Sequence, residues 1–369
     1  METLKKIGIL TWYNHGNYGS ALQAYALKTF LEKLGYKAQI IPYIPQWERS
    51  LLNANFLKKC KRFVKMLLGY CFECTPFKKN RFCDPFIYFR LNFLKLKGQC
   101  TEIDIAEYTK NFTTIISGSD QIWNPSFIDY VFLQNFEHDN NIRKISYAAS
   151  LGVMEMNNNQ QRTCYKKMLA SFHAISVREY AGKNILNSLG ISCEVHADPA
   201  LLLNALDYRK MYKSINWLKK KYIFCYILRT TKISYKDCIL EYANNYNLDV
   251  IGISYDKADY SWMKDMSTCS PREWLWLIDN AEIVMTNSYH ATIFSLIFHT
   301  DFFTFVRFPE ENSHSQNSRI DQLVQFFGIE KYIVDGNIPH VEKYDFNYFE
   351  NHLQQLQCKA SKYLKTNIF

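Results

Sequence analysis

A histidine lies between a predicted strand and a predicted helix in the segment AEIVMTNSYHATIFSLIF. Glu282–Met285 has the apolar pattern of a short buried strand, and Ala291–Phe298 has that of an apolar helix. Asn287 and Ser288 precede the helix, where their side chains can cap free N–H groups. Ligands of open α/β sheets bind where strands end and helices begin. His290 at such a junction can bind an anion, transfer a proton, or do both.

Two arginines directly follow apolar strand patterns and are candidates for holding that anion. Arg178 follows Ala174–Val177, and Arg229 follows Tyr222–Leu228. A guanidinium in such a place can hold a carboxylate or a phosphate through two parallel hydrogen bonds. Taken singly, each arginine is equally well explained by a salt bridge between strands. Together with His290 they make two permanent cations and one titratable group at strand ends.

Two further arginines in the same half of the chain are candidates for the anion site. Asn317–Ile320 reads as a polar turn before a helix, which favours an Arg319 that points into a cleft. Arg307 ends a strand pattern and is more typical of a solvated charge. Asp198, within His196–Pro199, is either an acid–base group or a carboxylate that caps the next helix, and the cap is the commoner role.

The loop NHGNYGS, which ends at Ser20, precedes a predicted helix and contains two glycines. Such a loop brings backbone N–H groups close to an anionic ligand, and His15, Asn17 and Gly19 are candidate contacts within it. The glycines are three residues apart and no third follows, so dinucleotide binding is weakly supported. Turn geometry alone would also explain them. Asp120 belongs to a second polar loop that follows a predicted strand.

No motif for covalent or metal-dependent catalysis is found in the sequence. Ser20, Ser119 and Ser150 lack the pattern of a nucleophile elbow, and no HExxH pattern occurs. We therefore expect no metal at the site. The eleven cysteines are scattered along the chain. Cys71 and Cys74 have the spacing of half a zinc site, but no second pair matches, which favours free thiols.

Strand, loop and helix patterns alternate along the chain, which predicts an α/β fold with parallel, doubly wound sheets. We expect two Rossmann-like domains, 1–204 and 205–345, that face a cleft as in GT-B glycosyltransferases. We expect the C-terminal helix, 346–369, to pack back on the first domain. Residues 47–98 break the alternation with many basic and aromatic side chains. This insertion is either a membrane-proximal or acceptor-binding face, or a helical cover whose aromatic rings pack inward.

The net charge of +9 favours anionic partners such as phosphates, acidic glycans or anionic lipid surfaces. No nucleic-acid-binding module is recognisable, so we expect no nucleic acid partner. The N-terminal sequence enters a strand directly and lacks a signal-peptide pattern, and no apolar run approaches the roughly 20 residues of a spanning helix. We therefore expect a cytoplasmic protein. Peripheral contact with the inner face of the cell membrane and formation of a homo-oligomer stay open.

The chain resembles the polysaccharide pyruvyl transferase family in seven short segments that occur in the family's order. They lie between Ile7 and Ile320 and read GILTWYNHGNYGSALQAYAL, IISGSDQIWNP, ISYAASLG, ISVRE, ADPALLL, ILR and TNSYHATIFSLIF. The resemblance implies transfer of pyruvate from phosphoenolpyruvate to a sugar of a polysaccharide or of its lipid-linked precursor. The product would be a cyclic ketal, with phosphoenolpyruvate as the donor substrate and no cofactor.

The resemblance also assigns residues by position. The catalytic positions of the family match Arg178, Arg229 and His290. Arg319 matches less closely, because the spacing after the histidine varies in the family. The donor site would be completed by Arg319, Arg307, Asn287 and Ser288. The acceptor side and its loop would include Asn17, Gly19, Ser20, His15 and Asp120.

Two departures from the family pattern affect this assignment. Ser20 stands where many members have an acid, which removes one candidate acid–base group. Ser288 and Tyr289 precede His290 where some branches have an arginine, so a donor-binding arginine must come from another segment. A nucleotide-sugar-dependent glycosyltransferase has the same architecture and also uses cations at strand ends. A non-catalytic glycan-binding or assembly protein is the third hypothesis.

Overall fold

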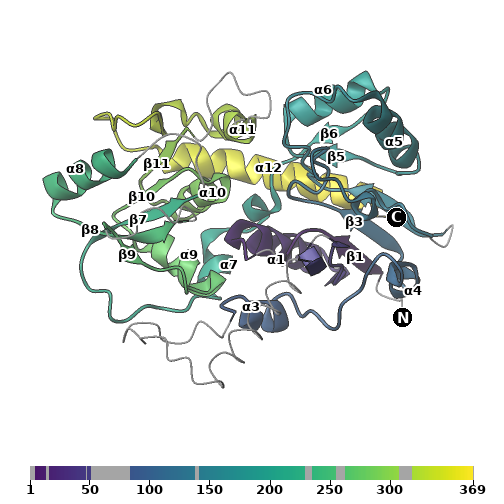
Figure 1. Ribbon diagram of the computed structural model, residues 1–369, viewed down its shortest axis with the longest axis horizontal. Coiled ribbons are helices and arrows are strands. Elements are labelled where there is room, and N and C mark those ends of the chain that lie inside the picture. The colour runs from purple at the N-terminus through teal and green to yellow at the C-terminus, as the bar shows by residue number, and fades with distance from the viewer. Residues whose placement is uncertain are drawn as a thin grey trace, which may run out of the picture.

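The computed structural model describes residues 5–13, 16–46, 48–50, 84–137, 141–228, 235–254, 262–306 and 318–368. Two parallel β-sheets stand side by side with helices packed against their faces, and a long C-terminal helix spans both (Figure 1). The architecture is α/β with two Rossmann-like halves, as the alternation of sequence patterns predicts.

The first sheet has the strand order β2-β1-β3-β4 and is parallel throughout. Its strands are β1 (Lys6–Leu10), β2 (Lys37–Ile40), β3 (Thr114–Ser117) and β4 (Arg143–Ser146), and a short parallel pair follows, β5 (Ser176–Val177) and β6 (Glu194–Val195). Isolated bridges from Ile145 to Ala174 and from Ala149 to Val177 join this pair to β4. The strand order reverses between β1 and β3, so the loops after these two strands flank a topological switch point.

The second sheet has the order β12-β11-β10-β7-β8-β9 and is also parallel. Its strands are β7 (Tyr222–Ile227), β8 (Asp249–Ser254), β9 (Lys264–Asp265), β10 (Ile283–Thr286), β11 (Phe302–Phe305) and β12 (Ile333–Val334). Every residue of β7, β10 and β11 is buried, as expected for central strands that helices cover on both faces. The strand order reverses between β7 and β10, which makes a second switch point.

Helices connect the strands of both sheets. Those before β7 are α1 (Tyr18–Lys33), α3 (Ile87–Asn92), α4 (Ile105–Thr109), α5 (Asn159–Leu169), α6 (Tyr180–Ser188) and α7 (Ala205–Arg209), with 3-10 turns η1 (Tyr130–Leu133) and η2 (Pro199–Leu202). Those after β7 are α8 (Lys236–Tyr246), α9 (Pro271–Asp279), α10 (Tyr289–Phe298), α11 (Ser318–Phe327), η3 (Glu330–Tyr332) and α12 (Phe346–Asn367). The start of α9 is encoded locally, because Ser270 and Glu273 form a reciprocal capping box around Pro271.

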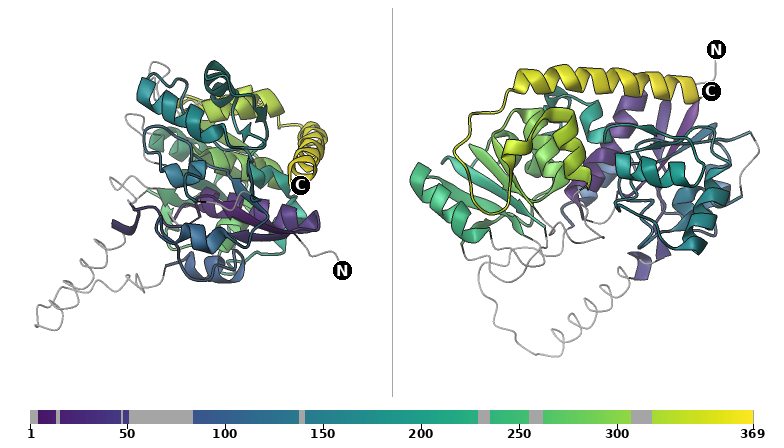
Figure 2. Two further views of the ribbon diagram at one scale, coloured as in Figure 1. Left: turned by 90° about the vertical axis from the view of Figure 1, so that its right-hand side faces the viewer. Right: turned by 90° about the horizontal axis from the view of Figure 1, so that it is seen from above.

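The C-terminal helix α12 returns to the first sheet, as predicted. It begins beside the second half and ends beside the first (Figure 2). The hydroxyl of Tyr363 donates a hydrogen bond to the carbonyl oxygen of Ser146 at 2.9 Å. The hydroxyl of Thr114 donates to the carbonyl oxygen of Ile368 at 3.2 Å. The helix therefore ties the two halves together.

Aromatic rings fill the seam between the halves. Tyr18 in the first turn of α1 stacks on Trp274 of α9, with ring centroids 5.3 Å apart. The Tyr18 hydroxyl donates a hydrogen bond to the carbonyl oxygen of Cys269 at 2.8 Å. Tyr226 of β7 meets both rings edge-on. A continuous apolar cluster consequently includes residues of both halves and fixes the position of α1 between them.

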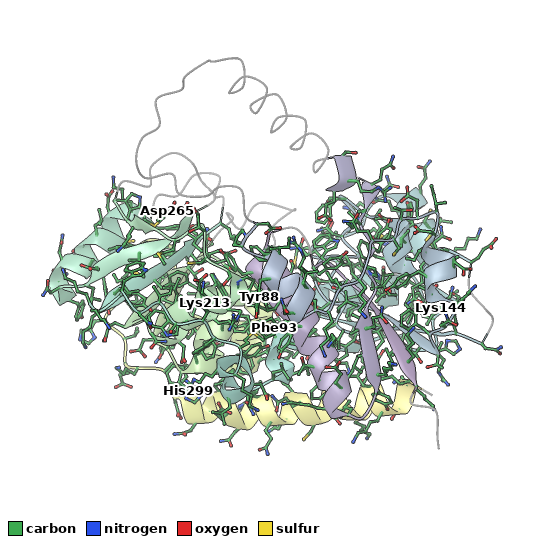
Figure 3. The ribbon with its side chains drawn as sticks, turned by 90° about the horizontal axis from the view of Figure 1, so that it is seen from below. Tyr88, Phe93, Lys144, Lys213, Asp265 and His299 are labelled. Atoms are coloured by element: carbon green, nitrogen blue, oxygen red, sulfur yellow. The ribbon has the colours of Figure 1, made fainter. Side chains whose placement is uncertain are left out.

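Part of the basic, aromatic insertion is described, including 84–98, whereas 51–83 lie outside the described residues. Phe86 and Phe89 are buried in the apolar core, so these two rings pack inward as the second interpretation of the insertion expected. Tyr88 on α3 is exposed on the face seen in Figure 3. Within the described ranges, no helix combines the length and the apolar character needed to cross a membrane.

The cysteines that the structure describes are free thiols. The candidate zinc-spaced pair, Cys71 and Cys74, lies outside the described residues.

Candidate functional site

The N-termini of two helices from different halves meet at His290. Helix α10 begins at Tyr289 rather than at the predicted Ala291, so His290 lies in its first turn. Gly19 lies in the first turn of α1, and a Cβ built on it would stand 2.1 Å from Nδ1 of His290. Only glycine leaves room for the imidazole at this position. Both helices therefore direct the positive ends of their dipoles toward the same place.

A buried carboxylate contacts His290 from the first half. His290 is 6% exposed, and its Nε2 lies 3.4 Å from Oδ2 of Asp198, which is completely buried. The other oxygen of Asp198, Oδ1, accepts a hydrogen bond from the N–H of Ala200 at 2.9 Å and caps η2. Asp198 thus has the capping role that its sequence predicts and also contacts the candidate catalytic histidine.

Arg178 is fully buried at the end of β5, among three carboxylates. Its Nη1 donates to Oδ2 of Asp198 at 2.7 Å, its Nη2 lies 4.0 Å from Asp120, and its Nε lies 3.7 Å from Glu179. Arg178 therefore forms ion pairs with carboxylates, as one of its two interpretations from the sequence expected. Among the residues that the structure describes, Nε and Nη2 of Arg178 have no hydrogen-bond partner. Both donors therefore face carboxylates without a direct hydrogen bond.

The two buried aspartates stay ionised despite their burial. Burial by itself raises the pKa of Asp198, but the charges of His290 and Arg178 outweigh it and hold that pKa well below its usual range. Burial also raises the pKa of Asp120, yet Arg178, His290 and a hydrogen bond from Ser20 bring it below its ordinary value. The site therefore combines buried carboxylates with a permanent cation and a titratable imidazole.

The first loop anchors Asp120. Asn17 is the N-cap of α1, and its Oδ1 accepts hydrogen bonds from the N–H groups of Gly19 at 2.9 Å and Ser20 at 3.3 Å. The hydroxyl of Ser20 donates to Oδ2 of Asp120 at 2.5 Å. Ser20 is thus in contact with a carboxylate from the second polar loop. His15 lies outside the described residues.

Asn287 and Ser288 hold the backbone around the second switch point. The side-chain amide of Asn287 accepts from the N–H of Leu228 at 2.7 Å and donates to its carbonyl oxygen at 3.0 Å. Ser288 caps α10, with its Oγ 3.5 Å from the N–H of Ala291. These side chains therefore fix the end of β7 and the start of α10. Arg229, the next residue after Leu228, lies outside the described residues.

Tyr289 brings Arg319 into the same neighbourhood. The guanidinium of Arg178 lies 4.8 Å from the centre of the Tyr289 ring, and that of Arg319 on α11 lies 5.7 Å from it. Arg319 thus lies near the residue before His290, and its role in donor binding stays a prediction. Arg307, the other candidate, lies outside the described residues.

The sequence analysis did not place Glu179 or Tyr289 in the site. For Asp198 it gave acid–base chemistry as one of two possible roles. Glu179 accepts hydrogen bonds through Oε1 from the N–H groups of Leu151 at 2.8 Å and Gly152 at 2.9 Å. The sequence did contain a signal for Glu179, because this acid lies at the end of a predicted strand and next to a candidate arginine. Tyr289 could have been suspected only from its place beside the histidine.

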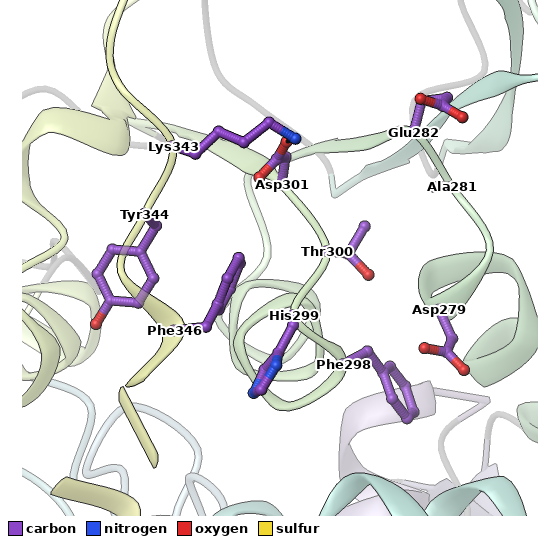
Figure 4. A pocket seen from close by; sticks show the side chains of 10 residues that line it. All are labelled: Asp279, Ala281, Glu282, Phe298, His299, Thr300, Asp301, Lys343, Tyr344 and Phe346. Atoms are coloured by element: carbon purple, nitrogen blue, oxygen red, sulfur yellow. Dashed lines mark ion pairs between the residues drawn. The ribbon is translucent and has the colours of Figure 1, made fainter. Parts of the chain in front are cut away.

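A pocket of about 390 Å³ lies at the opposite end of the second sheet, away from His290 (Figure 4). It is lined by residues that precede β10 and β11 and by the segment before α12. Its charged groups bind one another or their neighbours: Asp301 pairs with Lys343 at 2.8 Å, and Asp279 pairs with Arg209 at 2.8 Å. This pocket contributes nothing to the cluster around His290.

Comparison with known proteins agrees with the fold and identifies the family. The UDP-GlcNAc 2-epimerase from Methanocaldococcus jannaschii has a similar structure, with a TM-score of 0.53 and 11% identity over 96% of this chain and 93% of that chain. A putative UDP-N-acetylglucosamine 2-epimerase from Listeria monocytogenes gives a TM-score of 0.49 and 10% identity over 95% and 94% of the two chains. At such identity the likeness concerns the fold alone, two Rossmann-like domains in the GT-B arrangement.

No curated protein matches the chain. The family model for polysaccharide pyruvyl transferase matches residues 17–307, and the chain belongs to this family.

Proposed function

We propose that this protein transfers pyruvate from phosphoenolpyruvate to two hydroxyl groups of a saccharide, forming a cyclic ketal and releasing phosphate. One observation carries the proposal: His290, Asp198 and Arg178 meet where both switch points converge, in a member of this family. Ligands of doubly wound folds bind at such places.

The charges at the site suit a small anion with a phosphate and a carboxylate. Arg178 has two buried donors without a hydrogen bond, and the guanidinium of Arg319 also lies near the Tyr289 ring. The N-termini of α1 and α10 add favourable dipoles. Arg229, which follows Leu228 in the sequence, is proposed as a third cation of the donor site. These groups would bind the donor and offset the charge that develops on the leaving phosphate.

The reaction requires two new C–O bonds at one carbon. A proton is added to the methylene carbon of phosphoenolpyruvate, and the oxygen of one hydroxyl attacks the central carbon and loses its proton. The bond from that carbon to the phosphate oxygen then breaks, and the second hydroxyl attacks, loses its proton and closes the ketal. His290 would give and take these protons, and Asp198 would hold the imidazole in place.

A ligand-stabilisation experiment separates this proposal from a nucleotide-sugar glycosyltransferase. Phosphoenolpyruvate is expected to raise the Tm of the protein, and the Tm should rise further with ligand concentration, because a ligand that binds only the folded state stabilises it. UDP-sugars and GDP-sugars serve as the comparison. A shift with a nucleotide sugar and none with phosphoenolpyruvate would favour the glycosyltransferase. Acceptor binding without phosphate release would favour a non-catalytic glycan-binding protein.

A lipid-linked acceptor at the inner face of the cell membrane is part of the proposal, on the basis of the basic insertion. Replacing Lys58, Lys59, Lys61 and Arg62 by glutamine is expected to weaken binding to vesicles that contain anionic lipid, with roughly 1 kcal/mol lost per cation near the surface. Sedimentation with vesicles of anionic and of neutral lipid measures this. Equal sedimentation of the variant and the unchanged protein would discard the membrane contact.

A further inference from the structure

One face of α11 is directed into the seam between the two halves. Arg319, Gln322 and Phe326 are spaced at i, i+3 and i+7, so they share this face. Arg319 reaches the Tyr289 ring at one end, and Phe326 packs against the apolar clusters of both halves at the other. Helix α11 also contacts α6 of the first half, beside which it lies in Figure 1. Gln322 therefore stands between the candidate donor cation and the interdomain core.

The amide of Gln322 is buried without a hydrogen bond. The residue is 2% exposed, and neither Nε2 nor Oε1 has a partner in the part of the chain that the structure describes. A buried polar group left in this state destabilises the folded protein, because it has lost its hydrogen bonds to water. Native proteins keep few such groups, and each one that persists requires an explanation such as a functional role, a water or an ion. Gln322 has two such atoms and lies next to the proposed active site, which points to a ligand that forms hydrogen bonds with both.

The two orphaned atoms differ in chemistry, and this selects the ligand. Nε2 of Gln322 can only donate a hydrogen bond, and Oε1 can only accept one. The carboxylate and phosphate of phosphoenolpyruvate are acceptors, so they would satisfy Nε2 and leave Oε1 facing an anion. Two neighbouring hydroxyls satisfy both atoms, because one donates to Oε1 while the other accepts from Nε2.

We propose that Gln322 binds the pair of acceptor hydroxyls that become the ketal, and so determines which saccharide is pyruvylated. The inference rests on the proposed transferase function and adds a residue for acceptor recognition. Side chains one turn apart on a helix have Cβ atoms about 5–6 Å apart. That spacing places an acceptor held by Gln322 next to a donor held by Arg319, as the bond to be formed between them requires.

The test compares Gln322→Met with Gln325→Met. Methionine keeps the length of the side chain and removes both hydrogen-bonding atoms, and Gln325 is exposed on the same helix, which makes it a matched control. Gln322→Met is expected to raise KM for the saccharide by roughly 10- to 100-fold, the loss of two hydrogen bonds, and to change KM for phosphoenolpyruvate by less than about twofold. Its Tm is expected to stay the same or to rise, because an unpaired buried amide is removed.

Each other result contradicts a distinct part of the inference. A lower Tm with unchanged saccharide KM would make Gln322 a structural residue. If KM rises for phosphoenolpyruvate and not for the saccharide, Gln322 binds the donor and not the acceptor. If the unchanged protein transfers pyruvate and Gln322→Met has the same KM for the saccharide, only the role of Gln322 is overturned. Failure of the unchanged protein to release phosphate from phosphoenolpyruvate with any saccharide overturns the transferase proposal and this inference together.

Discussion

His290→Asn lowers kcat for pyruvyl transfer by about 10²- to 10⁴-fold, because the reaction loses the group that exchanges protons with donor and acceptor. Asparagine is polar and smaller than histidine, so it fits against Gly19 without a clash. The fold is expected to remain intact, and the decrease should appear mainly in kcat. The rate of phosphate release from phosphoenolpyruvate in the presence of acceptor measures it.

The matched control is His299→Asn. His299 ends the same helix, with a left-handed backbone conformation that asparagine also adopts, and it is exposed beside Glu350. This variant should keep near-normal activity. Near-normal phosphate release by His290→Asn would remove the histidine from the mechanism, whatever the control does.

Asp198→Ala destabilises the protein by about 3–5 kcal/mol, the range for removing one partner of a buried ion pair. Arg178 loses its 2.7 Å partner, His290 loses its neighbouring carboxylate, and η2 loses its cap. Urea-induced unfolding measures the change in the free energy of unfolding. The control Asp335→Ala removes an exposed carboxylate, so it should change that free energy by about 0.5 kcal/mol or less.

The acid dependence of stability provides a second test of the same residue. The pKa of Asp198 in the folded protein lies below its ordinary value, so its contribution to stability is complete above about pH 4, where the unfolded chain is ionised. The contribution is lost as pH falls through the acid range toward the folded pKa. Asp198→Ala should therefore lose less stability on acidification than the unchanged protein does. Equal acid dependence in both proteins would contradict the buried ion pair.

Local sequence patterns predict the strands and the place of His290 well. β1 has the predicted bounds, and α10 begins two residues earlier than predicted because Ser288 caps it. Apolar runs, capping residues and glycines carry this information within a few residues of each position. The return of α12 to the first sheet could also be anticipated from its position after the second half.

Contacts between the halves could not be predicted from local patterns. Asp198 and His290 lie on different halves, and their contact depends on how two sheets and α1 pack against one another. Arg178 shows the same limit, because its position after a strand fits both an anion-binding residue and a salt bridge. Its complete burial beside Asp198 follows from the parallel pairing of β5 with β6, which places the two strand ends together.

The most direct test of the proposed function is mass spectrometry of saccharide acceptors incubated with the protein and phosphoenolpyruvate. We expect an acceptor whose mass increases by one pyruvate less one water, with one phosphate released per product. With His290→Asn in place of the unchanged protein, the adduct should form about 10²- to 10⁴-fold more slowly. Acceptors that stay unmodified with phosphoenolpyruvate but gain a hexose from a nucleotide sugar would contradict the pyruvyl transferase.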